Sequence, residues 1–77
     1  MREFHIAMHS FRQVQDFVDL AMEQPFEISV GNDQQNINGK DFMGMFSLDY
    51  SRPVRVKMHC TDEQFHHFHK TVTQKLA

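Results

Sequence analysis

The chain has 77 residues, one cysteine and a formal net charge of −2 when its histidines are neutral. This length predicts one domain over residues 1–77 with a thin core, and the single cysteine excludes an internal disulfide and favours a reducing, cytoplasmic setting. Charges of both signs are mixed along the chain and no apolar run reaches the ~20 residues of a membrane span, so neither nucleic-acid nor membrane binding is expected.

The first half of the chain predicts a strand, a helix and two further strands. Residues 2–8 alternate between apolar and polar, which is typical of a half-buried strand. Ser10-Phe11-Arg12-Gln13 matches a capping box and predicts a helix near 10–24, which Pro25 ends. Residues 26–30 alternate again, and the polar residues 34–38 predict an edge strand. The apolar stripe expected for the helix consists of Phe11, Val14, Phe17, Val18, Ala21 and Met22.

The second half predicts a short helix, a strand and a long helix. Asp41 is suited to cap a short helix near 41–48 with its side chain. Residues 54–60 show the clearest alternation in the chain, with Cys60 on the inward side. Thr61-Asp62-Glu63-Gln64 is a second capping box and predicts a helix near 61–76. The expected order is therefore β-α-β-β-α-β-α.

This order predicts an α+β fold in two layers. Four strands with one apolar face each would form a mainly antiparallel four-stranded sheet. Three amphipathic helices would bury their apolar stripes on one face of that sheet and leave the other face in water. The expected architecture is thus an open-faced β-sandwich.

Three segments resemble the HPr family of phosphocarrier proteins from the bacterial sugar phosphotransferase system. The run from Asn38 to Leu48, NGKDFMGMFSL, is similar to the HPr segment with the regulatory serine and the second helix. Thr61-Asp62-Glu63 opens the last helix as in HPr, and residues 2–6 resemble the first HPr strand. The resemblance covers the whole chain and implies an HPr-like fold.

The same resemblance shows where the chain departs from the family. In HPr a histidine followed by Ala-Arg-Pro opens the first helix and accepts phosphate from enzyme I. The matching residues here begin with Ser10 in place of the histidine, retain Arg12, and end with Gln13 in place of the proline. The resemblance therefore implies a vestigial phosphohistidine site at Ser10 and Arg12. The regulatory serine corresponds to Asp41.

Each of these positions has a structural and a functional interpretation. Ser10 can act as a helix cap alone, because a serine phosphoester is too stable to pass its phosphoryl group on. His9, one residue earlier, is the alternative phosphoacceptor. Asp41 can be an ordinary cap, or a fixed negative charge where HPr carries a switchable phosphate.

Other apolar and histidine clusters leave similar alternatives open. The short helix contains more large apolar residues than it can bury, so they form either a partner-docking surface or core: Phe42, Met43, Met45 and Phe46. His66, His67 and His69 suggest a metal site by number, but their spacing matches no ligand motif and favours a solvated helix face. We expect no metal and no cofactor.

Together these observations predict a non-enzymatic regulatory adaptor that acts by protein–protein binding. Expected partners are phosphotransferase-system enzymes or a transcriptional regulator of carbon catabolite control. One alternative is a phosphocarrier in sugar transport that accepts phosphate on His9. The other is an HPr-like interaction module of unrelated role.

Overall fold

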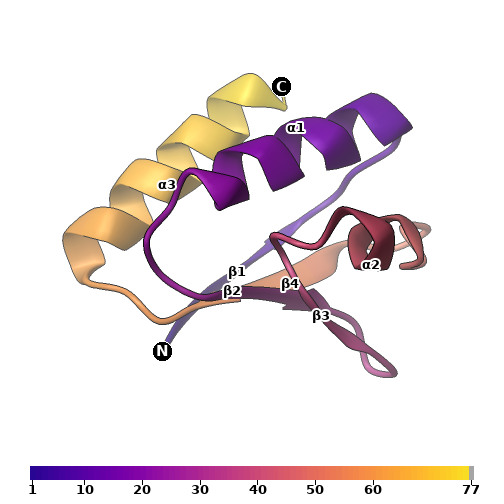
Figure 1. The fold of residues 1–77 in the computed structure, drawn as a ribbon, viewed down its shortest axis with the longest axis horizontal. Helices are drawn as coiled ribbons and strands as arrows, with labels where there is room; N and C mark the ends of the chain where they lie inside the picture. The colour runs from indigo at the N-terminus through magenta and orange to yellow at the C-terminus, as the bar shows by residue number, and fades with distance from the viewer. Residues whose placement is uncertain (77) are drawn as a thin grey trace.

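The computed structural model describes residues 1–76; Ala77, the last residue of the predicted domain, lies outside the described residues. The predicted element order is confirmed. The elements are β1 (Arg2–Ile6), α1 (Phe11–Met22), β2 (Ile28–Gly31), β3 (Asn36–Asn38), α2 (Phe42–Phe46), β4 (Val54–Met58) and α3 (Asp62–Lys75). Figure 1 shows α1 and α3 side by side over the sheet, with α2 on the same side next to β3.

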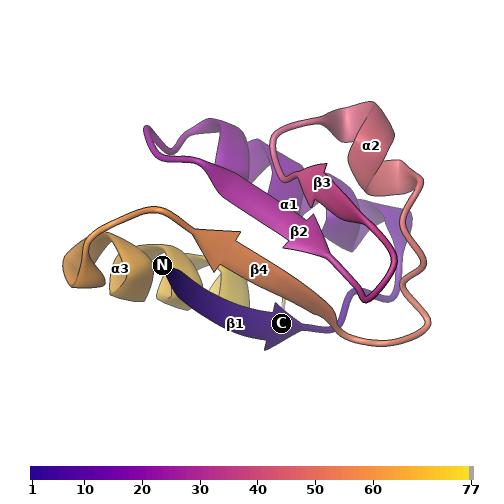
Figure 2. The ribbon, with the colours of Figure 1, turned by 90° about the horizontal axis from the view of Figure 1, so that it is seen from below.

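The four strands form one antiparallel sheet in the order β1-β4-β2-β3. The last strand in sequence, β4, therefore lies between β1 and β2 (Figure 2). One row across the sheet joins Phe4, Val56, Val30 and Ile37. The expected edge position of the polar third strand is confirmed.

The core lies between the sheet and the helices. Strand alternation points Val54, Val56 and Met58 of β4 inward, and all three are completely buried. Phe68 of α3 meets Phe17 of α1 edge-to-face, with ring centroids 5.8 Å apart. Aromatic pairs of this geometry stabilise a core beyond their buried area, which matters in a chain with so few core residues.

The long last helix begins at the predicted capping box. The Thr61 hydroxyl accepts from the Gln64 backbone N–H at 3.1 Å, and the Gln64 side chain accepts from the Thr61 N–H at 3.0 Å. Two acids, Asp62 and Glu63, occupy its first turn, where the positive end of the helix dipole favours them.

Arg2 lies on the same, helix-covered side of β1 as Phe4, and its guanidinium forms an ion pair with Asp62 at the start of α3. The structure differs from the prediction at three other positions. Cys60 is half-buried rather than a core residue, and burial raises the pKa of its thiol. Phe11 and Met22 of the expected apolar stripe, the first and last residues of α1, are 77% and 57% exposed rather than buried. Within residues 1–76, no helix is long and apolar enough to cross a bilayer.

Candidate functional site

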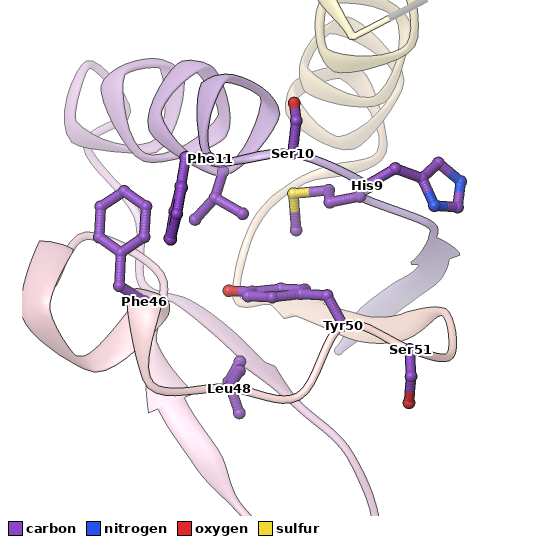
Figure 3. Close-up of a pocket in the computed structure, with 9 residues that line it drawn as sticks. His9, Ser10, Phe11, Phe46, Leu48, Tyr50 and Ser51 are labelled. Atoms are coloured by element: carbon purple, nitrogen blue, oxygen red, sulfur yellow. The ribbon is translucent and has the colours of Figure 1, made fainter.

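A hollow of about 450 Å³ lies between the start of α1 and the segment that leaves α2. Figure 3 shows Phe11 and Phe46 on one side of it and Tyr50 across its floor. Its lining combines apolar and polar groups and consists of Met8, His9, Ser10, Phe11, Val14, Phe46, Leu48, Tyr50 and Ser51. The hollow therefore places the matched phosphohistidine position, Ser10, and Phe46 of α2 around one surface.

Ser10 is the N-cap of α1, as the capping motif predicted. Its hydroxyl accepts from the Gln13 backbone N–H at 3.2 Å. The Gln13 side chain, however, accepts from the N–H of His9 at 2.6 Å, one residue before the cap. Its amide nitrogen also donates to the Leu76 carbonyl at 3.0 Å. Gln13 therefore ties the segment before α1 to the end of α3.

The remaining residues of the matched site are not arranged around a common anion position. The imidazole of His9 is exposed and points away from the hollow, and the Ser10 hydroxyl also points outward (Figure 3). Arg12 is largely exposed, with its Nε atom 4.0 Å from Oδ2 of Asp16 on the next turn. This ion pair directs the guanidinium along α1 rather than toward the helix start.

Asp41 is at the N-cap of α2, but its side chain makes no capping hydrogen bond. The predicted side-chain cap is therefore wrong. The Asp41 backbone N–H donates to the Asn38 carbonyl at 3.0 Å, and its carbonyl accepts from the Met45 N–H at 2.9 Å. The carboxylate lies over Gly44, where a Cβ atom would meet Oδ2 at 2.7 Å. Its charge is thus exposed beside the short helix.

Two side chains fix the position of α2. Lys40, just before the helix, donates from Nζ to the Gln24 carbonyl at the end of α1, at 2.7 Å. The Tyr50 hydroxyl, after the helix, donates to the Met45 carbonyl, and burial raises the pKa of Tyr50 to about 12. The first bond ties the start of α2 to the end of α1, and the second ties the segment after α2 back to the helix.

The four large residues of α2 divide between core and surface. Met45 is completely buried in the core cluster, so of the two alternatives, docking surface and core, it takes the second and is not available to a partner. Met43 is 83% exposed. Phe42 and Phe46 are half-buried and stack on each other with centroids 5.6 Å apart.

Sequence reasoning missed one member of this surface. Phe11 of α1 lies 5.4 Å from Phe46 between ring centroids. Its position directly after the N-cap was a signal, because a first-turn side chain has no preceding turn to cover it. We call Phe11, Phe42, Met43 and Phe46 the α1–α2 surface.

The histidines of α3 remain on the surface. His66, His67 and His69 are all exposed, and His69 stacks on Phe65 at 5.8 Å between ring centroids. Among residues 1–76, no three side chains of histidine, cysteine, aspartate or glutamate are grouped as metal ligands would be.

The two N-cap residues are expected to contribute differently to the stability of the fold. We expect Ser10→Ala to lower the free energy of unfolding by about 1 kcal/mol, because the N–H of Gln13 loses its acceptor. Asp41→Ala should change it by less than about 0.5 kcal/mol, since the carboxylate caps nothing. Urea denaturation of both variants measures the difference; equal losses would contradict the geometry of the α2 start.

No protein-family model matches the sequence, and no curated protein matches it. Solved structures do match. HPr-C-His from Thermoanaerobacter tengcongensis is 26% identical over 99% of this chain and 91% of its own, with a TM-score of 0.75. Crh of Bacillus subtilis, a catabolite-repression protein described as an intertwined, domain-swapped dimer, is 20% identical over 96% of this chain and 88% of its own, with a TM-score of 0.64. The chain therefore has an HPr-like fold.

Proposed function

We propose that this chain is a non-catalytic, HPr-like regulatory adaptor, which docks a protein partner through the α1–α2 surface and carries no phosphoryl group. The observation that carries this proposal is the exposure of Met43 and Phe11, at 83% and 77%, next to the stacked rings of Phe42 and Phe46. Exposed apolar side chains that gather on one surface are typical of protein interaction sites.

The chemistry at the start of α1 supports a non-catalytic role. The resemblance to HPr matches Ser10 to the phosphoaccepting histidine, and Ser10 is engaged as a helix cap. A serine phosphoester would not return its phosphoryl group to a second protein. Arg12, the retained arginine, lies beside Asp16 on the next turn of α1.

A phosphocarrier role through His9 is the second candidate, because this imidazole is exposed and accessible to another protein. Its backbone is held by Gln13 at 2.6 Å, so the ring is presented from a fixed point. However, phosphoryl transfer depends on alignment, and His9 lies before the helix start rather than at it.

The proposed partner is a phosphotransferase-system enzyme or a transcriptional regulator of carbon catabolite control, in the cytoplasm. The similarity to HPr and to Crh supports this choice. Asp41 adds an exposed negative charge beside Met43, at the position matched to the regulatory serine of HPr. A partner with apolar side chains and a neighbouring arginine or lysine would fit both features.

Met43→Asp is expected to weaken binding of such a partner at least about tenfold, because it places a charge at the centre of a desolvated apolar contact. The matched control is Met22→Asp, an exposed methionine at the far end of α1, which should bind as the unmodified chain does. Biolayer interferometry measures the affinity of each variant for a purified transcriptional regulator of carbon catabolite control and for enzyme I. Equal weakening by the two variants would contradict the α1–α2 surface as the docking site.

A further inference from the structure

The outer edge of β1 has no neighbouring strand among residues 1–76. β1 pairs with β4 in an unbroken register from Arg2 to Ile6 and lies at the border of the sheet (Figure 2). Phe4 and Ile6 point to the helix-covered side but stay half-buried, whereas Val54 and Val56 opposite them are completely buried. This edge therefore presents unpaired backbone groups and partly exposed apolar side chains, which is a template for another strand.

The other edge of the sheet is less suited to pairing. β3 has three residues, two of which are asparagine, and its inward residue Ile37 packs against the core cluster beside α2. A short polar strand flanked by a helix is a protected edge. The two edges of this sheet thus differ, and β1 is the open one.

The side chains of β1 are complementary to a second copy of the same strand. In an antiparallel pair with a two-fold axis through Phe4, Glu3 of each copy lies opposite His5 of the other. Both side chains are exposed on the open face of the sheet, and a carboxylate accepts a hydrogen bond from an imidazole N–H. Side chains directly opposite across antiparallel strands are close enough for such contacts.

The same axis also brings apolar groups together on the covered face. The Phe4 ring lies 4.7 Å from His69 and 6.1 Å from Phe65 between ring centroids, so a small aromatic cluster reaches from α3 to the sheet edge. A two-fold axis perpendicular to the sheet sets the two Phe4 rings side by side and keeps the helices of both copies on one face. Both faces of β1 are therefore compatible with the same register.

We propose that the chain forms a symmetric dimer in which two β1 strands pair antiparallel about Phe4, joining two four-stranded sheets into one. Each β1 stays paired with β4 of its own copy. This interface is separate from the α1–α2 surface, so both can be occupied at once.

The test is sedimentation velocity of the full chain over a range of concentrations, together with His5→Glu. In the dimer this change sets Glu3 against a second carboxylate at two symmetric positions and should raise the dissociation constant about tenfold. In the monomer, residue 5 faces Arg55 of β4, so the variant should keep its circular dichroism spectrum and thermal midpoint. The double variant Glu3→His with His5→Glu recreates both opposite pairs and should restore the dimer.

Asn36→Glu on the opposite edge is the matched control and should leave the dissociation constant unchanged. A mass of 9.2 kDa at every concentration up to about 1 mM would overturn the proposal. So would a dimer that His5→Glu does not weaken, or a domain-swapped dimer that fails to dissociate on dilution.

Discussion

Incubation of the chain with phosphoenolpyruvate and catalytic enzyme I is expected to leave its intact mass unchanged. Ser10 provides an oxygen that caps α1 and not an imidazole nitrogen. His9 provides the nitrogen, but its ring points away from the hollow at the helix start (Figure 3). A displacement of about 1 Å can cost ~100-fold in a reaction that depends on alignment, and His9 is displaced by one residue.

An ordinary HPr labelled in the same reaction is the control. A gain of one phosphate mass that is lost in acid and absent from His9→Ala would show a phosphocarrier and contradict the adaptor proposal. Ser10→His tests whether the start of α1 can support phosphoryl transfer once an imidazole is present there. If this single change restores labelling, then the start of α1 retains the geometry for transfer and lacks only the imidazole.

Phe68→Ala is expected to lower the free energy of unfolding by about 3–5 kcal/mol. Phe68 is completely buried in α3, and its ring meets Phe17 at 5.8 Å and Phe26 at 6.2 Å, both edge-to-face. The cavity would separate α3 from α1 and from the segment before β2. A chain of this length is stabilised by only about 4–12 kcal/mol in total, so the variant should melt at far lower temperature.

The matched control is Phe11→Ala, which removes an equally large ring that is 77% exposed. It should change the free energy of unfolding by less than about 0.5 kcal/mol, as measured by urea denaturation. Similar losses from both variants would mean that Phe11 belongs to the core and would remove it from the α1–α2 surface.

The sequence predicted the fold wherever a side-chain pattern repeats often enough to define a face. The alternation in β4 is the clearest case, since Val54, Val56 and Met58 are all buried as expected. Polar capping patterns also located the helix starts at Ser10 and Thr61. These signals are local, because each is carried by residues that lie close together in the sequence.

The candidate site was harder to predict because its geometry depends on contacts between distant segments. A five-residue helix has no repeat that tells which of Met43 and Met45 faces inward, and the packing of α2 on the sheet decides it. Gln13 was placed in a local capping box, but half of its hydrogen bonding goes to Leu76, which is 63 residues away. Asp41 fits a cap by type, yet its carboxylate lies over Gly44 instead.

The central position of β4 has a consequence for how the chain is made. β1 is synthesised before the other three strands of this sheet, but its pairing residues are 54–58, which follow only after β2, β3 and α2. Until those residues emerge, the β2–β3 hairpin is the part of this sheet that can form. The edges of β1 and β2 that later pair with β4 keep unpaired backbone groups. Strand insertion is therefore a late step that closes the whole sheet at once. A nascent chain halted before residue 54 is expected to be a chaperone substrate rather than a partly folded domain.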